Sequence, residues 1–156
     1  MKKLSLILSL SLIILTGSSC IKDDNGCQLK TVQSEEGAIL AYAAANGITA
    51  TKHPSGMYYQ IINQGSGPTP SSSSILSVKY TGKLTNGTIF DQRTTSPVSF
   101  PLNGVIAGWQ LGLPLIQKGG VIKLIIPSTL GYGCQDNGPI PAYSILYFEI
   151  ELVDVI

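Results

Sequence analysis

Two aromatic residues and a carboxylate, Tyr80, Phe90 and Asp91, flank a hairpin signal in the middle of the chain. The residues before Asn86-Gly87 are rich in β-formers, and this dipeptide favours a two-residue type I′ turn, because both central residues of that turn need positive φ. The hairpin would place Tyr80 and Phe90 on paired strands, where two large side chains can wall one cavity. Because Asp91 follows directly, we expect an apolar pocket with one polar group.

Further motifs follow in a fixed order along the chain. They are Tyr80-Thr81-Gly82, Gly87, Phe90-Asp91, Val105-Ile106-Ala107-Gly108-Trp109, Gly131-Tyr132-Gly133, Ile140-Pro141 and Leu146 to Leu152. Over about residues 55–156 their order and spacing closely resemble those of the FKBP-type peptidyl-prolyl cis-trans isomerases. One such motif would be a weak signal, whereas several in register are a strong one.

The resemblance implies a site with three catalytic positions, Asp91, Tyr132 and Ile106. The Tyr132 hydroxyl and the Ile106 backbone N–H would each donate to a substrate carbonyl. Asp91 would orient hydroxyls or face the amide carbon, and it is not expected to act as a general base. The implied substrate-binding residues, with Trp109 as the floor, are Tyr80, Phe90, Val98, Val105, Trp109, Ile140, Tyr143 and Phe148.

Three positions depart from the family pattern. Val98 stands where most members carry an aromatic wall residue. The connection from Asp91 to Val98 is shorter than in the best-known members, so Arg93 matches the arginine that pairs with the aspartate only loosely. Ala142 stands where a second proline is usual. These differences predict a more open wall and an altered substrate preference.

The implied reaction is rotation about the bond that precedes a proline, and the partners would be proline-containing polypeptides. Amide resonance imposes a barrier of about 18–20 kcal/mol, and an enzyme can lower it by binding the twisted amide better than the planar one. No nucleophile, metal or cofactor is required. The expected clients are unfolded or nascent envelope proteins, and macrolide-type molecules are expected as inhibitors.

A structural interpretation exists for each of these residues. Taken singly, Trp109 and the aromatic walls would be core residues, and Asp91 would be a strand-end cap. His53 precedes a proline in a polar loop and is interpreted as structural or incidental. A non-catalytic polypeptide-binding or chaperone module with the same pocket is the alternative function.

The first residues predict export. Met1-Lys2-Lys3 and the apolar run that follows are typical of a secretory signal, since the run is too short to span a bilayer comfortably. The segment ending at Cys20 resembles a bacterial lipobox, although Gly17 departs from its preferred aliphatic residue. We therefore predict a signal at 1–19, a linker and short helix at 20–54, and an isomerase domain at 55–156. The protein would be lipid-anchored at Cys20 in the bacterial cell envelope, on the periplasmic or surface face of the outer membrane, with an ordinary cleaved signal as the alternative.

Composition excludes other classes of function. Lys and Arg number 10 against 9 Asp and Glu, and this near balance argues against nucleic-acid binding, which needs a basic surface. A single His and the lack of a Cys-x-x-Cys motif argue against a zinc site. Cys27 and Cys134 could pair in an oxidising compartment or remain free, because sequence does not place their Cα atoms.

The local patterns predict mostly strands. A helix is expected from Ser34, as N-cap, to Asn46, packed on the domain or partly ordered. The other expected elements are strands at 57–62, 98–102, 121–127 and 145–156, a loop at 92–97, a helix at 105–113 and an irregular flap at 128–144. With the central hairpin, this is an α+β fold, a curved antiparallel sheet of about five strands wrapped around one short helix.

Overall fold

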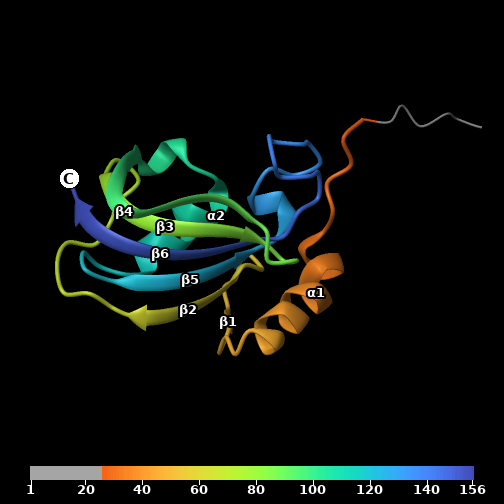
Figure 1. The fold of residues 1–156 in the computed structure, drawn as a ribbon, viewed down its shortest axis with the longest axis horizontal. Helices are drawn as coiled ribbons and strands as arrows, with labels where there is room; N and C mark the ends of the chain where they lie inside the picture. The colour runs from red at the N-terminus through yellow and green to blue at the C-terminus, as the bar shows by residue number, and fades with distance from the viewer. Residues whose placement is uncertain (1–25) are drawn as a thin grey trace, which may run out of the picture.

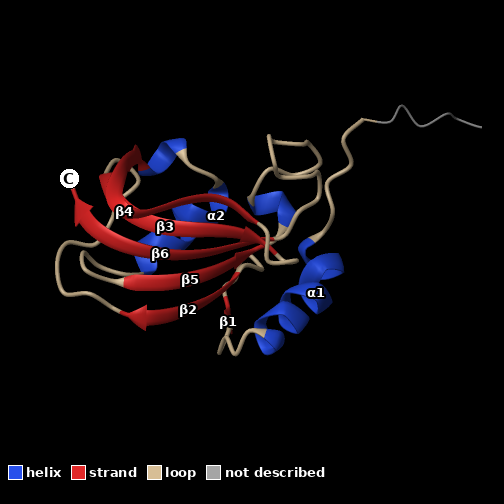
Figure 2. Ribbon diagram, in the orientation of Figure 1, coloured by secondary structure: helices blue, strands red, loops and turns tan. Residues whose placement is uncertain are grey.

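The computed structural model describes residues 26–156, in which one antiparallel sheet carries a helix on each face (Figures 1 and 2). The predicted signal and Cys20 lie outside the described residues. The strands are β1 (Thr51–Lys52), β2 (Tyr58–Asn63), β3 (Ile75–Leu84), β4 (Ile89–Pro101), β5 (Val121–Ile126) and β6 (Leu146–Val155), in the sheet order β1-β2-β5-β6-β3-β4. The helices are α1 (Val32–Ala45), α2 (Ala107–Gly112) and the 3-10 turns η1 (Leu102–Gly104), η2 (Leu113–Leu115) and η3 (Ser128–Leu130).

The predicted fold class, a curved antiparallel sheet around a short helix, is confirmed. The sheet has six strands rather than about five, because Thr51–Lys52, predicted to be part of a connection, pairs with β2. Within residues 26–156, no helix is long and apolar enough to cross a membrane.

The sheet separates two hydrophobic clusters, because successive strand residues point to opposite faces. Leu124 and Phe148, which are register partners on β5 and β6, belong to the larger cluster with Trp109 of α2. Ile125 and its partner Tyr147 belong to the smaller cluster beneath α1. The alternation on these strands thus lets one sheet hold both helices.

Helix α1 is longer at its start than predicted. Thr31 is the N-cap and its side chain accepts from the Ser34 N–H at 3.3 Å, so the prediction of Ser34 as N-cap was wrong. Ser34 lies in the first turn instead, and its hydroxyl donates to the Thr31 carbonyl. Ile39 and Ala43 are buried against the sheet, which agrees with the expected packing of this helix on the domain.

Helix α2 is shorter than the predicted span of 105–113. It begins at Ala107 and gives way after Gly112 to η2, because Pro114 cannot continue the helix. A Cβ on Gly108 would lie 2.5 Å from Ile126 of β5. The glycine therefore allows α2 to sit directly on the sheet.

The turn after β3 is not the predicted type I′ turn. Gly87 has φ of 90°, whereas Asn86 is not among the positive-φ residues of the described chain. The Gly87 N–H donates to Leu84 O at 2.9 Å and the Leu84 N–H donates to Thr88 O at 2.9 Å. This is a three-residue hairpin loop that ends in a left-handed glycine.

Strand β4 runs without a break through Ile89–Pro101 and forms one edge of the sheet. The predicted loop at 92–97 lies within this strand. Gln92 and Arg93 pair with Thr81 and Tyr80 of β3, so the prediction was wrong there, whereas residues 94–97 have no register partner on β3 and form a bulge at the register shift between Val78 and Tyr80. The edge position predicted for 98–102 is confirmed, and it suits the prolines, whose missing N–H leaves no sheet bond unmade at an edge.

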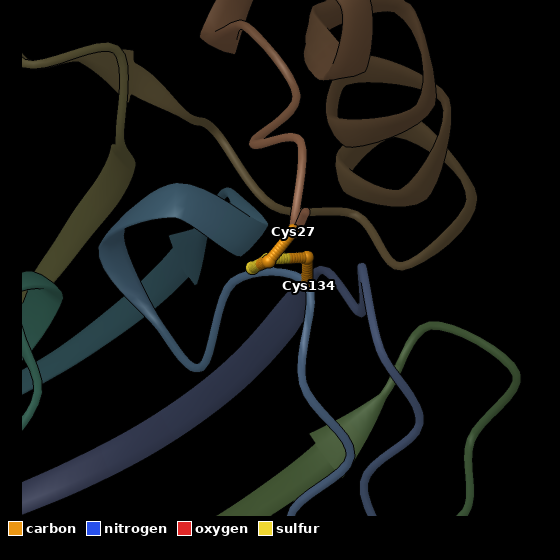
Figure 3. Close-up of a disulfide and its surroundings, with 2 residues drawn as sticks. All are labelled: Cys27 and Cys134. Carbon is orange, nitrogen blue, oxygen red and sulfur yellow. A yellow bond between two sulfur atoms is a disulfide. The ribbon is translucent and has the colours of Figure 1, made fainter. Parts of the chain in front are cut away.

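A disulfide joins Cys27, in the segment before α1, to Cys134 in the irregular loop at 128–144 (Figure 3). Their Cα atoms are 5.5 Å apart, a common separation for bonded cysteines. The pairing that the sequence left open is thus formed.

Candidate active site

A cavity of about 560 Å³ lies between the sheet, α2 and the loop at 128–144, which we call the flap. This volume suits a small apolar ligand or part of a peptide. Every predicted catalytic or binding residue except Tyr143 lines it, namely Tyr80, Phe90, Asp91, Val98, Val105, Ile106, Trp109, Tyr132, Ile140 and Phe148.

The floor of the cavity is aromatic. Trp109 is 5% exposed, and its ring centroid lies 5.2 Å from those of Tyr80 and Phe148, edge to face in both cases. Phe100 adds a third ring at 6.1 Å. Each such pair stabilises by about 0.5–1.5 kcal/mol beyond area burial. The floor is therefore fixed before any ligand binds.

Gly82 explains how two walls of the cavity meet. A Cβ at this position would lie 2.6 Å from the Phe90 ring and 2.7 Å from the Phe148 ring. Those two rings contact each other edge to face, with centroids 5.4 Å apart. Because Gly82 of the Tyr80-Thr81-Gly82 motif has no side chain, both rings can pack against its backbone.

One wall carries a cluster of polar groups. The Tyr80 hydroxyl donates to Asp91 Oδ2 at 2.5 Å, and Arg93 Nη1 donates to Oδ1 of the same carboxylate at 3.2 Å. The register places Gly82 opposite Asp91 and Tyr80 opposite Arg93. Burial, followed by the hydrogen bond to Asp91, raises the pKa of Tyr80 well above its usual value. At neutral pH the Tyr80 hydroxyl is therefore protonated and fixed in direction.

Two further donors lie at the mouth of the cavity. Ile106 precedes α2, and no backbone carbonyl in residues 26–156 accepts its N–H. The Tyr132 side chain is 38% exposed, and burial, then the negative charge of Asp91, raises the pKa of its phenol. Both groups are therefore available as donors to a carbonyl oxygen at neutral pH.

The predictions from the sequence differ from the structure at three residues around the cavity. Phe100 lines the cavity, and its alternation with Val98 along β4 was the signal that could have found it. Arg93 contacts Asp91 directly, whereas only a loose match was expected. Tyr143 lies in a second cavity behind the flap, with the Lys30 ammonium 5.1 Å from its ring centroid.

Comparison with known proteins gives the family. A family model described as FKBP-type peptidyl-prolyl cis-trans isomerase matches residues 67–153. The chain is 40% identical over 119 residues to the isomerase FkpA of Aeromonas hydrophila, covering 75% of this chain and 44% of that protein. It is 41% identical over 117 residues to the FKBP-type 22 kDa isomerase of Escherichia coli, covering 73% and 56%.

Solved structures of peptidyl-prolyl isomerases have the same fold as this chain. The crystal structure of FkpA from E. coli superimposes with a TM-score of 0.71 at 38% identity, covering 80% of this chain and 60% of that one. A peptidyl-prolyl isomerase from Pseudomonas syringae gives 0.68 at 31% identity, covering 82% and 98%. The chain belongs to the FKBP-type peptidyl-prolyl cis-trans isomerase family. It spans about half the length of the curated relatives it matches.

Proposed function

We propose that the chain is a peptidyl-prolyl cis-trans isomerase that assists the folding of proteins outside the cytoplasm. The observation that supports this most is the combination of an aromatic floor at Trp109 with the polar groups of Asp91 and Tyr132 in one cavity. A site that only holds apolar segments needs the aromatic surface but not this polar pair.

The proposed mechanism is selective binding of the twisted amide. A planar amide has the larger dipole and loses more solvation in a dry aromatic cavity, so the rotated state is favoured there. The prolyl ring would rest on Trp109, while the Ile106 N–H and the Tyr132 hydroxyl hold carbonyl oxygens of the substrate. Asp91 fixes the Tyr80 hydroxyl and accepts no proton in this scheme, because the reaction transfers none.

The proposed site of action is the cell envelope. The Cys27–Cys134 disulfide supports an oxidising compartment, because such bonds rarely persist in the cytosol. Lipidation at Cys20 would tether the domain to the outer membrane on its periplasmic or surface face, and acyl chains contribute about 0.8 kcal/mol per buried methylene. The clients would be unfolded or nascent envelope proteins with exposed prolines, and macrolide-type molecules would compete for the cavity.

The test is the cis-trans exchange rate of a short peptide with an apolar residue before proline, followed by NMR exchange spectroscopy. The protein should accelerate exchange, and Asp91→Ala and Tyr132→Phe should each slow it about tenfold or more, as expected for lost positioning or donation. Tyr147→Phe is the matched control, because this tyrosine faces the smaller cluster under α1.

The alternative is a non-catalytic polypeptide-binding or chaperone module. It predicts that the same peptide binds, as seen by chemical-shift changes, while its exchange rate equals that in buffer. That result would reject the isomerase proposal and retain the cavity as a binding site.

A further inference from the structure

The segment at the start of the described chain, residues 27–35, contacts the flap on both sides of Tyr132. Four contacts make up this interface: the Cys27–Cys134 disulfide, Leu29 against Gly133, Lys30 over the ring of Tyr143, and Glu35 to Ser128. The flap is irregular apart from η3, and it supplies Tyr132 and Ile140 to the cavity. These four contacts tie the segment to the flap, and Figure 3 shows the disulfide among them.

Glu35 makes the innermost contact. Its side chain is 3% exposed, and Oε2 accepts hydrogen bonds from the Ser128 N–H at 2.9 Å and from the Ser128 hydroxyl at 3.0 Å. The Ser128 carbonyl in turn accepts the N–H groups of Gly131 at 3.0 Å and Gly133 at 2.8 Å. The two residues that flank Tyr132 are thus tied to a serine that Glu35 anchors.

The remaining contacts act on the other side of Tyr132. Gly133 has φ of 66°, and a Cβ on it would lie 2.9 Å from Leu29 Cδ2. Its carbonyl accepts the Tyr143 N–H at 2.7 Å, and Tyr143 is the residue beneath Lys30. Cys134, bonded to Cys27, follows directly. The backbone is therefore fixed immediately before and after the tyrosine.

Burying a carboxylate is costly unless it is well bonded, and Glu35 Oε1 has no hydrogen-bond partner within residues 26–156, with Lys30 Nζ 4.0 Å away. Packing of α1 on the sheet does not need this charge, because Ile39 and Ala43 supply the apolar contact. We attribute the burial of the Glu35 carboxylate to its hydrogen bonds with Ser128 of the flap. Fixing an irregular loop in advance removes the entropic cost of ordering it when substrate binds.

We propose that residues 27–35 form a clasp that positions Tyr132, with Glu35 and the Cys27–Cys134 disulfide as positioning residues for the reaction proposed above. The segment is then a working part of the isomerase site and more than a spacer before the domain. Because these residues act through Tyr132, their removal should matter only while the Tyr132 hydroxyl is present.

The kinetic test uses the purified full chain at a temperature where circular dichroism shows every variant fully folded. Glu35→Ala and the double variant C27S/C134S should each lower kcat/KM for the proline peptide about fivefold or more. Glu35→Gln should keep at least half of the wild-type value, because its amide oxygen can still accept from Ser128. In a Tyr132→Phe background the same changes should have almost no further effect.

Glu36→Ala is the matched control on the same helix. Glu36 accepts hydrogen bonds from Lys52 and Tyr58, which belong to β1 and β2 and not to the flap, so its removal should lower the melting temperature without changing kcat/KM. Equal kinetic losses for Glu35→Ala and Glu36→Ala would overturn the clasp. So would an undiminished effect of Glu35→Ala in the Tyr132→Phe background.

A second measurement separates the clasp from the isomerase proposal. In Glu35→Ala the amide hydrogens of Gly131 and Gly133 should exchange at least tenfold faster, while those of β5 keep their wild-type rates. Unchanged exchange at both glycines would reject the clasp. If the wild-type chain does not accelerate peptide exchange, the isomerase proposal fails, and the amide exchange rates still decide whether residues 27–35 hold the flap.

Discussion

Gly82→Ala tests how the cavity walls are assembled, because it adds one methyl group where Phe90 and Phe148 meet. The new Cβ would lie 2.6 Å and 2.7 Å from these two rings. Ordinary carbon contacts begin at about 3.4 Å, so each ring must move by roughly 0.7–0.8 Å. Both rings line the cavity, and their displacement changes its shape directly.

The expected loss of stability is modest. Overpacking a well-filled site costs about 1–3 kcal/mol, and replacing a strand glycine by alanine returns about 0.5–1 kcal/mol of backbone entropy. The free energy of unfolding should therefore fall by at most about 2.5 kcal/mol. The protein stays folded, whereas affinity for the proline peptide should fall severalfold because both displaced rings line the cavity.

Gly87→Ala is the matched control. It is the same substitution at the end of the hairpin loop, where a Cβ meets nothing within 4 Å but φ of 90° strains any side chain. We expect a stability loss of similar size, about 1–2 kcal/mol, with unchanged peptide affinity. Urea unfolding and NMR titration with the peptide give both quantities. Equal affinity losses in the two variants, or none in Gly82→Ala, would refute this account of the walls.

Two further predictions concern stability. Gly37→Ala should stabilise the protein by about 0.5–1 kcal/mol in urea unfolding, because Gly37 is exposed within α1 with nothing within 4 Å of its Cβ position; a loss of stability would contradict the helix assignment there. Burial raises the folded-state pKa of Tyr80 and Tyr147 above the usual value of about 10. Their contribution to stability is full below about pH 10 and is lost as pH rises further, because the unfolded chain then releases protons that the folded chain keeps. Melting temperatures should fall between pH 9 and 11.5, and less steeply in Tyr147→Phe, while an identical slope would count against this cause.

Most of the cavity lining could be predicted from the sequence, because the residues that form it lie in motifs with fixed spacing. Tyr80, Phe90 and Asp91 are brought together by one hairpin, and Trp109 by the short helix that the sheet surrounds. Phe100 was missed although it lies in the predicted strand at 98–102, because its alternation with Val98, which places both side chains on one face, was not used. The strand β4 spans Ile89–Pro101, and its stretch at 94–97, which carries Pro97, bulges away from the β3 pairing, so local sequence signals did not separate it from a loop.

The contacts between residues 27–35 and the flap could not be predicted from the sequence. Glu35 lies in the first turn of a helix, where an acidic residue is ordinary, and nothing local indicates that it accepts from Ser128. The separation of 107 positions between Cys27 and Cys134 likewise hides their contact. The predicted turn type was wrong for a different reason. Asn-Gly suits both a two-residue loop and the last two positions of a three-residue loop.

The single tryptophan of the sequence is the floor of the cavity. Its intrinsic fluorescence therefore comes from one known position and reports occupancy of the site without a label. The indole Nε1 is buried and has no hydrogen-bond partner within residues 26–156. A ligand that brings an oxygen atom to this Nε1 would shift the emission spectrum as well as the intensity. A single titration can therefore distinguish a ligand that only fills the cavity with apolar groups from one that hydrogen-bonds to Trp109.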